Sequence, residues 1–433
     1  MLQDLFHIPH NWLGAGWLLL LWAIVSGVLL LYLWWRQGWN ADTRSYVPLL
    51  AVMGLLIWQV LPRLEGVAGG GGGQGLPIRG YGVMLLLGVL AGVGLAVREA
   101  RRVGLDPDAV ISLCFHLFVF GILGARLFYV LEYWPQFRRP GDPTATLAAI
   151  LNVTQGGLVV YGSFIGALLG GLWFLRRNTL PTLAVADLMA PSLVIGLAVG
   201  RLGCLLNGCC YGGVCDAPWA LTFPSGSEPY RHQQSLGQLH GFQIAEDPAS
   251  HATLVVAVQP DGPAAAAGLK TGATVTGIDG RRVDSFAEAR ELLRGSTNRL
   301  ELLADQQLVT IRVPELPPRS RPAHPAQLYA AIGAALLCWL LWSYYPVRRR
   351  DGEVFALLLT LYPVMRFLEE TIRVDEPGQF RTSFSISQWI SILLLAAVVG
   401  LWLYVLRQPP GCALARADGT SGDTPACTRS FPG

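Results

Sequence analysis

Long apolar runs recur along this chain and restrict its fold more than any other feature. Each run approaches the ~20 residues that an α-helix needs to cross ~30 Å of hydrocarbon. Only 14% of the 433 residues are charged, whereas a soluble domain carries roughly 25%, and the mean hydropathy is +0.43. Because the runs are continuous and lack period-two alternation, they exclude a membrane β-barrel. We therefore predict an all-α multi-span membrane protein with about nine transmembrane helices, over residues 12–35, 45–61, 81–97, 110–131, 158–175, 185–206, 326–345, 354–368 and 386–406.

Clusters of arginine predict how these spans are oriented. They follow the third, fifth and seventh runs, in short loops to which the positive-inside rule applies. All three clusters then lie in the cytoplasm, which places the N-terminus outside and the C-terminus inside. The first run has no basic segment before it and no clear cleavage site after it, so we interpret it as a retained span and not a signal peptide. The arginines are Arg98, Arg101, Arg102, Arg176, Arg177, Arg348, Arg349 and Arg350.

The segment 200–213 lies where the sixth run ends, and its composition is unlike that of a lipid-facing helix. It contains Arg201, several glycines and three cysteines. An arginine is costly in a bilayer unless it is paired or solvated, and glycine lets the backbone approach a ligand closely. This composition favours a site that holds a lipid phosphate at the outer surface. The alternative is a helix that extends its arginine to the interface and ends on glycine.

Residues 234–314 have the composition of a water-soluble domain. Residues 254–258 predict a strand, 264–269 a short helix, and 272–283 two strands joined by a tight Asp-Gly turn. An amphipathic helix over 285–294 and strands over 300–303 and 308–313 complete the order. We predict a soluble α+β insert here.

This order, together with Pro263-Ala264-Ala265-Ala266-Ala267-Gly268-Leu269, resembles a bacterial PDZ domain. In that family a short loop receives the terminal carboxylate of a peptide on backbone N–H groups, and the peptide adds a strand. The resemblance implies that Leu239, Gly241 and Phe242 form this loop, with His240 where the family usually has an apolar residue. Peptide C-termini are then candidate partners, although such domains also serve as spacers.

The rest of the chain resembles prolipoprotein diacylglyceryl transferase, in four islands. The first is Ile78-Arg79-Gly80-Tyr81-Gly82, and the second is Gly124-Ala125-Arg126 followed by Gln155-Gly156-Gly157-Leu158-Val159-Val160-Tyr161-Gly162. The third is the segment 200–213 with Pro218-Trp219-Ala220-Leu221. The fourth is His324-Pro325-Ala326-Gln327 with Tyr362-Pro363-Val364-Met365-Arg366 and Glu369-Glu370-Thr371-Ile372-Arg373, before Ser387-Gln388-Trp389.

The resemblance implies an enzyme of the bacterial inner membrane that needs no cofactor. Such an enzyme transfers a diacylglyceryl group from phosphatidylglycerol to the cysteine thiol of a prolipoprotein, at the outer face of the membrane. The implied catalytic residues are Arg201 and Arg366, which hold the phosphate, with Glu370 as an orienting partner four residues from Arg366 on one helix face. The implied substrate-binding residues are Tyr81, Arg126, Asn207, Gly212 and Arg373.

The chain departs from the family pattern where a base is expected. The family typically has histidine at the position of Tyr161, and it has asparagine and glutamate at the positions of Cys204 and Cys209. Tyrosine ionises near pH ~10, so Tyr161 needs nearby cations to act as a base. His324 is the substitute candidate. An intramembrane ion pair without a catalytic role remains the alternative for Arg366 and Glu370.

Four cysteines are spaced C-x4-C-C-x4-C on the predicted outer side: Cys204, Cys209, Cys210 and Cys215. Disulfides are the expected state outside the cytoplasm. A zinc site remains an alternative, although the usual CxxC knuckle is missing here. The other two alternatives are a reactive thiol that accepts an acyl or diacylglyceryl group, and free cysteines that serve only in packing.

These observations predict five segments and leave alternatives for function. An active transferase is the main interpretation, and the alternatives are an inactive lipid- or peptide-binding relative that works through the insert, and a thiol oxidoreductase. The net charge of +3 and the lack of a basic-aromatic patch do not indicate nucleic acid as a partner. The segments are an N-terminal extension with two spans over 1–75, a transferase core over 76–233 and 315–407, the PDZ-like domain over 234–314, and a disordered cytoplasmic tail over 408–433.

Overall fold

The computed structural model describes most of the chain, in two compact units. The described residues are 4–8, 15–38, 76–139, 141–152, 159–248, 250–376 and 382–414, with Val47, Leu50, Gly54, Trp58, Gly157, Gly378 and Gln379. The first unit, here the helical unit, contains the described residues of 2–196, 338–357 and 402–433. The second, here the head unit, contains 197–337 and 358–401.

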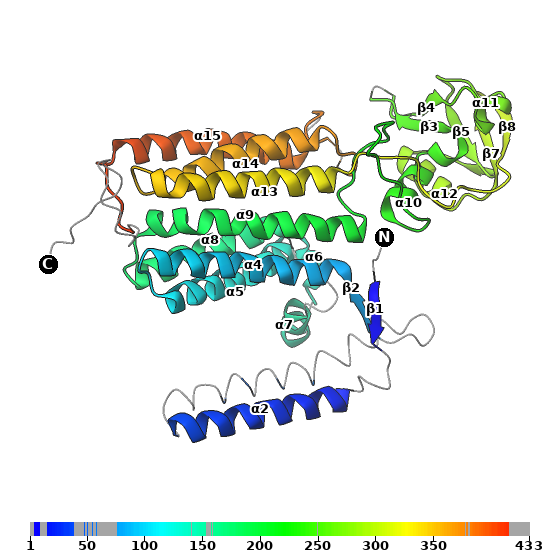
Figure 1. The fold of residues 1–433 in the computed structure, drawn as a ribbon. Coiled ribbons are helices and arrows are strands. Elements are labelled where there is room, and N and C mark those ends of the chain that lie inside the picture. Colours follow the sequence, from blue (N-terminus) through cyan, green and yellow to red (C-terminus); the bar gives the residue numbers. More distant parts are fainter. Residues whose placement is uncertain are drawn as a thin grey trace. The chain divides into compact units, whose positions relative to one another are not determined.

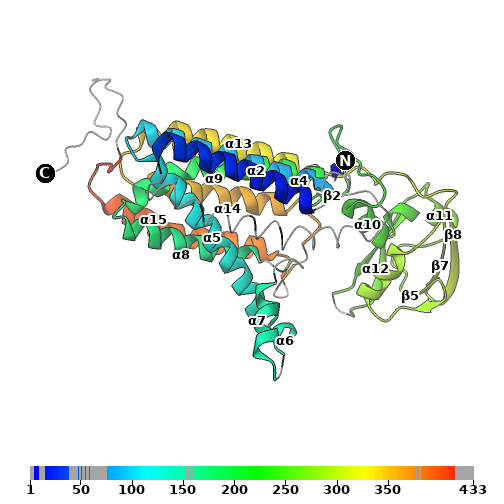
Figure 2. The same ribbon diagram turned by 90° about the horizontal axis from the view of Figure 1, so that it is seen from below.

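The larger helices account for most of the apolar runs (Figures 1 and 2). Four of them, α9, α13, α14 and α15, contribute residues to both units. The helices are α2 Ala15–Gln37, α4 Gly80–Arg102, α5 Pro107–Glu132, α6 Trp134–Phe137, α7 Pro143–Leu151, α8 Val160–Arg177, α9 Thr182–Asn207, α10 Glu228–Ser235, α11 Pro263–Ala266, α12 Phe286–Arg294, α13 Ala326–Tyr344, α14 Glu353–Glu370 and α15 Ile386–Arg407, with 3₁₀ turns at Gln238–His240 and Tyr345–Val347.

The strands are short and belong mainly to the insert. β1 and β2 pair antiparallel in the helical unit. In the head unit β3 pairs with β4, and β6-β5-β7-β8 form an antiparallel four-stranded sheet. The strands are β1 Asp4–Ile8, β2 Leu76–Arg79, β3 Phe242–Glu246, β4 Thr253–Val258, β5 Val275–Ile278, β6 Arg281–Arg282, β7 Arg299–Ala304 and β8 Gln307–Arg312.

Six of the described helices are long and apolar enough to cross a membrane: α2, α4, α5, α9, α13 and α15. They coincide with six of the predicted spans. Helices α8 and α14 lie at two further predicted spans, but each has only 18 residues and ends on a pair of charged residues. The predicted span 45–61 lies mostly outside the described residues.

Glycine allows the helices of the helical unit to approach closely. On α5 and α8, Gly124 faces Gly162 and Gly166, and a Cβ atom at Gly124 would lie 2.8 Å from the Gly166 Cα atom. On α4 and α9, a Cβ atom at Gly92 would lie 2.8 Å from the Ser192 carbonyl oxygen. Small residues at such crossings let two backbones pack together without a hydrophobic driving force.

A buried carboxylate caps the N-terminus of α14. Asp187 of α9 is fully buried and accepts hydrogen bonds from the backbone N–H groups of Gly352, at 2.7 Å, and Phe355, at 2.8 Å. It also pairs with Arg348, whose guanidinium stacks on the Tyr345 ring at 3.8 Å from its centroid. Because the first N–H groups of a helix have no partner within the helix, Asp187 performs the role of an N-cap from another helix.

The start of the C-terminal tail packs against the loop before α14. Gly411 donates its N–H to the Arg349 carbonyl oxygen at 2.9 Å, and Ala413 donates to the Asp351 carboxylate at 2.7 Å. The Cys412 side chain is buried. Residues 408–414 are therefore ordered, unlike the disordered segment predicted from residue 408, and residues beyond 414 lie outside the described part.

The insert forms the elements that its pattern predicts. Asp279 and Gly280, with φ of 47° and 73°, make the tight turn between β5 and β6. Ser285 begins α12 and accepts a hydrogen bond from the Glu288 N–H at 3.2 Å. The apolar core of the insert comprises Phe242, Ile244, Val255, Ala264, Leu269, Ala273, Val275, Ile278, Val283, Ala289, Leu293, Leu300, Leu302, Ala304 and Ile311.

The two chain segments that connect the insert run side by side. Pro224 and Arg319 form an antiparallel bridge, and Ser225 donates its N–H to the Pro318 carbonyl oxygen at 3.0 Å. Helix α10 follows this point and packs against α12 (Figure 2). The insert therefore separates more naturally near residues 225 and 318 than at the predicted 234 and 314.

We expect Gly162→Ala to destabilise the helical unit. Its new methyl group would meet the Gly124 carbonyl oxygen and lie 2.6 Å from the Phe128 Cβ atom, and such overpacking typically costs about 1–3 kcal/mol. The melting temperature of the detergent-purified protein should fall. Gly94→Ala is the matched control, because nothing lies within 4 Å of its added Cβ atom. Equal melting temperatures for the two variants would contradict this packing.

We also expect the insert to be removable at its paired ends. Replacing residues 226–317 with a short Gly/Ser linker should leave the remaining chain inserted and monodisperse, because the flanking segments already lie together. The variant in which only residues 236–314 are replaced should aggregate more, since it keeps α10 but lacks α12, the helix against which α10 packs. Membrane yield and size-exclusion profiles measure both. Failure of the larger deletion to reach the membrane would show that the insert is part of the core.

Candidate functional site

Arg201 lies on the last turns of α9 and is half-buried. Among the described residues it forms no hydrogen bond and no ion pair. Its guanidinium lies within electrostatic reach of Cys204, Cys210, Tyr362 and Glu369. An arginine in such surroundings without a carboxylate partner is suited to bind an anion from outside the chain.

Two further arginines share one buried carboxylate. Arg366 pairs with Glu370 at 2.5 Å, across one turn of α14, and Arg373 approaches the same oxygen at 3.4 Å. The four-residue spacing predicted the first pair. The Glu369 carboxylate lies within electrostatic reach of Arg201, Arg366 and Arg373. The head unit therefore gathers three cations around two glutamates.

Residues after α14 complete this network. Arg373 donates two hydrogen bonds to Asp375, at 2.9 and 2.8 Å. Burial opposes the charge of Arg373, but these hydrogen bonds raise the pKa of its guanidinium well above the ordinary value. Ser387 at the start of α15 accepts a hydrogen bond from Arg366 at 3.1 Å and donates one to Glu376 at 3.1 Å.

A small backbone network holds the loops of the site together. Gly212 donates its N–H to the His324 carbonyl oxygen at 3.1 Å and forms an antiparallel bridge with Arg373. A Cβ atom at Gly212 would lie 2.6 Å from the His324 Cβ atom. Glycine is required there because three segments of the head unit meet.

His324 belongs to the same part of the head unit. Its Nδ1 atom lies 3.4 Å from the Tyr329 hydroxyl, which accepts a hydrogen bond from the indole N–H of Trp219 at 2.6 Å. Gly212 and Arg373 thus connect the histidine to the arginine network through the backbone.

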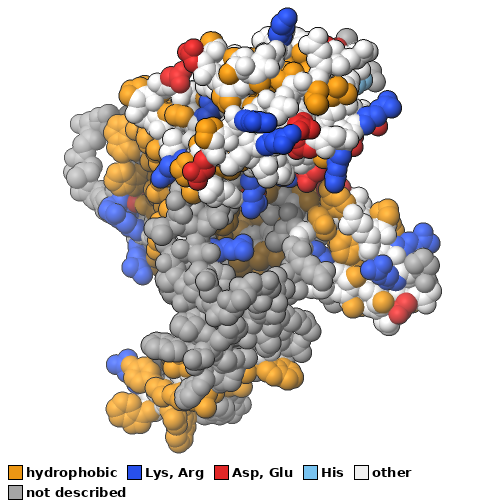
Figure 3. All heavy atoms as spheres, turned by 90° about the vertical axis from the view of Figure 1, so that its right-hand side faces the viewer, with side chains coloured by type: hydrophobic (Ala, Val, Ile, Leu, Met, Phe, Trp, Pro, Cys, Tyr) orange, Lys and Arg blue, Asp and Glu red, His pale blue; other side chains and the backbone are white. Residues whose placement is uncertain are grey.

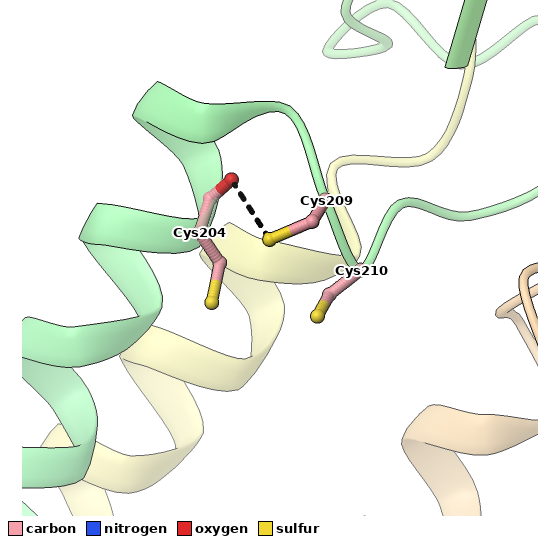
Figure 4. A group of neighbouring side chains, drawn as sticks. All are labelled: Cys204, Cys209 and Cys210. Atoms are coloured by element: carbon pink, nitrogen blue, oxygen red, sulfur yellow. Dashed lines mark hydrogen bonds between the residues drawn. The ribbon is translucent and has the colours of Figure 1, made fainter. Parts of the chain in front are cut away.

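The thiols of Cys204, Cys209, Cys210 and Cys215 are free in the structure. No disulfide joins these four, in contrast to the pairing expected from the sequence. The sulfur atoms of the first three lie within 4.8 Å of one another (Figure 4). Gln327, which is fully buried, donates its side-chain N–H to the Cys209 carbonyl oxygen at 2.7 Å. Asn207, the last residue of α9, directly precedes this turn.

Arg126 belongs to the helical unit, and its guanidinium is hydrogen-bonded to backbone carbonyl oxygens. It donates hydrogen bonds to the carbonyl oxygens of Ile150, Ala149, Asn152 and Gly157, at 2.8 to 3.1 Å. These contacts satisfy carbonyls at the end of α7 that lack helical partners. These hydrogen bonds give Arg126 a structural role, and the substrate contact that the resemblance implies stays a prediction.

Tyr81 and Tyr161 also belong to the helical unit. Tyr81 follows the first residue of α4 and is 40% exposed, whereas Tyr161 is on the first turn of α8 and is half-buried. Both make interactions within the protein. The structure thus brings Arg201, Arg366, Glu370, Arg373, Gly212, His324 and Asn207 together in the head unit.

The loop expected to receive a peptide carboxylate is engaged by the chain itself. Phe242 donates its N–H to the Gly237 carbonyl oxygen at 3.3 Å, and Ile244 donates to Leu236 at 3.0 Å. Leu239 and Phe242 are buried, and Gly241 has a φ of 84°. The fully buried His240 bonds to the Thr297 carbonyl oxygen at 2.9 Å, and burial lowers the pKa of its imidazole.

Sequence reasoning missed Asp375, Glu376 and Gln327 as parts of the site. The two acids follow Arg373 by two and three residues, a spacing that signals a pair only when the chain turns there. Gln327 lies in the quoted motif His324-Pro325-Ala326-Gln327, but its partner is a backbone carbonyl 118 positions away. Such a contact leaves no local pattern.

Comparison with known proteins covers nearly the whole chain. A family model described as prolipoprotein diacylglyceryl transferase matches residues 73–404. The phosphatidylglycerol–prolipoprotein diacylglyceryl transferase of Rhodopirellula baltica is 37% identical over 441 residues, 92% of this chain and 88% of the relative.

Two further relatives with the same name match shorter regions. That of Photobacterium profundum is 38% identical over 39% of this chain and 63% of its own length. That of Synechococcus elongatus is 36% identical over 37% of this chain and 53% of its own length. The full-length similarity and the family match together establish that this chain belongs to the prolipoprotein diacylglyceryl transferase family.

Proposed function

We propose that this protein transfers the diacylglyceryl group of phosphatidylglycerol to the cysteine thiol of a prolipoprotein. Arg201, which is without a carboxylate partner among the described residues, carries the proposal. Its neighbours Arg366 and Arg373 are held by Glu370 at 2.5 and 3.4 Å. An inactive family member would have no need of an unpaired cation at this depth, so the inactive alternative is not favoured.

The proposed reaction divides the work between the arginines. Arg201 and Arg366 hold the phosphodiester, and Arg373 and Asn207 help to position the lipid. The acceptor sulfur attacks the glyceryl carbon, the carbon–oxygen bond breaks, and glycerol phosphate leaves. Negative charge then gathers on the departing phosphate, where fixed cations in a water-poor site stabilise it most.

The thiol proton requires an acceptor. Tyr161 and His324 are the proposed candidates, with His324 favoured by its backbone connection to Gly212 and Arg373. Tyr81 and Arg126 are proposed to shape the lipid-binding side. For Arg126 the support is indirect, since its guanidinium holds the loop that precedes α8.

We infer the membrane arrangement from charge. With about nine spans in the inner membrane and the basic loops in the cytoplasm, the N-terminus and the insert lie on the periplasmic side and the tail lies inside. The arginine network then faces the surface at which secreted lipoprotein precursors emerge.

We infer that the insert is PDZ-like and serves mainly as a docking or spacer domain. The support is its strand order and the helix α12 beside β5. Binding of a peptide C-terminus at Leu239, Gly241 and Phe242 requires release of Leu236 and Gly237, because they already occupy the N–H groups. On the face that Figure 3 shows, basic and acidic side chains are interspersed, which does not favour a nucleic acid.

Arg201→Gln should lower the rate of lipid transfer by about 10²-fold or more, because removing one donor from a developing anion typically has that effect on kcat. The assay follows the mass increase of a lipobox peptide in phosphatidylglycerol micelles. Arg282→Gln is the control, since its side chain is 85% exposed on the insert and, within the described part of the chain, pairs with Asp284 alone. A wild-type rate for Arg201→Gln would remove the phosphate clamp from the mechanism.

Glu370→Gln should slow transfer by at least about tenfold while the protein still purifies as a monodisperse species. Arg373 retains Asp375 and Arg366 retains Ser387, so the fold persists, but both guanidinium groups lose the charge that fixes their spacing. A misplacement of about 1 Å can cost ~10²-fold in rate. Glu291→Gln, on an exposed side chain of α12, is the control. Unchanged kinetics would show that Glu370 only balances charge.

A further inference from the structure

Three thiols converge where α9 ends. The sulfur atoms of Cys204, Cys209 and Cys210 all lie within 4.8 Å of one another, and each residue is half-buried. In Figure 4 the thiols of Cys204 and Cys210 point toward the same space, with the Cys209 sulfur beside the Cys204 carbonyl oxygen. All three are free.

The backbone turns sharply to bring them together. Gly208 and Cys209 both donate their N–H groups to the Cys204 carbonyl oxygen, at 2.9 and 3.2 Å. Gly208 and Cys210 have φ values of 78° and 58°, and only glycine adopts this region without cost. Side chains of adjacent residues in an extended chain point to opposite sides, so the left-handed Cys210 is what turns its thiol back toward Cys204.

We propose that Cys204, Cys209 and Cys210 bind one Zn²⁺ ion as thiolates and leave its fourth position open. Zinc–sulfur bonds of ~2.3 Å in a tetrahedral site place sulfur atoms about 3.8 Å apart. The observed separations, of at most 4.8 Å, are within about 1 Å of this value, so the site needs only a small adjustment of the side chains to close. Three protein ligands with an open position are the pattern of a zinc ion that acts on a substrate.

The charges around the cluster suit this ion. Three thiolates and one Zn²⁺ ion carry a net charge of −1. Arg201 lies within electrostatic reach of Cys204 and Cys210, and Arg373 within reach of Cys210. The arginines therefore stabilise the thiolates and balance the complex as a whole. A disulfide would use only two of the three sulfur atoms and would leave these cations without thiolate partners.

The open position suits the thiol of the acceptor, an inference that rests on the proposed function. When the prolipoprotein cysteine binds zinc, its S–H proton is released to solvent or to His324, and a sulfur–zinc bond forms. The metal-bound sulfur then attacks the glyceryl carbon, the sulfur–zinc and carbon–oxygen bonds break, and glycerol phosphate leaves. Metal coordination deprotonates a thiol, which supplies the activation that Tyr161 alone provides poorly.

Metal binding by the full-length protein tests the site without reference to activity. The purified, reduced and chelator-treated protein is incubated with ZnCl₂, passed over a desalting column and analysed for bound zinc. We expect one zinc ion per chain, and a large loss of zinc in Cys204→Ser, Cys209→Ser and Cys210→Ser. Cys215→Ser and Cys114→Ser are the controls, and both should retain the metal.

Folding is checked by size exclusion and melting temperature, and zinc should raise the melting temperature of the wild type but not of the three variants. No bound zinc in the wild type, or full binding by the three variants, overturns the site. A disulfide that peptide mapping of unreduced protein assigns to Cys204, Cys209 or Cys210, in protein that excludes zinc, overturns the site in favour of that disulfide.

Cobalt tests the open position. The protein loaded with CoCl₂ should change its visible absorption when a lipobox peptide with cysteine is added, but not with the matched serine peptide. Equal spectra for the two peptides overturn the role of the acceptor thiol. Lipid transfer by a protein that binds no zinc would leave the proposed function intact and remove the metal. Binding of zinc and of the cysteine peptide without any lipid transfer would leave the metal site intact and remove the proposed function.

Discussion

One buried carboxylate between two arginines organises the head unit. Glu370 is 6% exposed and receives Arg366 from its own helix and Arg373 from the following loop. Leaving a buried charge without its partner is strongly unfavourable, so this shared ion pair ties the last turn of α14 to the segment that follows it. The backbone bridge between Arg373 and Gly212 then fixes the loop after α9 relative to this ion pair.

The helical unit meets a different requirement with different means. Its helices offer few polar groups to one another, and close approach depends on glycine pairs such as Gly124 and Gly162. Two buried polar groups of this unit have several partners: Asp187 caps the start of α14, and Arg126 holds the carbonyl oxygens at the end of α7. Such groups stabilise the scaffold by holding segments that are distant in the sequence.

The sequence predicts the periodic features and misses the long-range ones. The apolar runs, the Asp279-Gly280 turn and the Ser285 start of α12 follow from local chemistry, and the structure has them. The Arg366–Glu370 pair follows from helical spacing. The convergence of the three thiols was not predicted, because it depends on left-handed backbone at Gly208 and Cys210. Helix α10 was missed, since its composition is polar and its stability depends on long-range contacts, with α12 and with the backbone of Arg321.

The hydrogen bonds that an arginine already makes within the protein distinguish Arg126 from Arg201 better than their sequence motifs do. Arg126 and Arg201 both stand in motifs that resemble the same family, and both lie on apolar helices. Arg126 is 8% exposed and gives its N–H groups to four carbonyl oxygens, whereas Arg201 has no hydrogen-bonding partner among the described residues. A cation already satisfied by the backbone gains little from a phosphate, since binding would break bonds of similar strength. Arg201 is free to make the full charge-assisted contact, and for this reason we propose the anion site at the end of α9, beside the thiols.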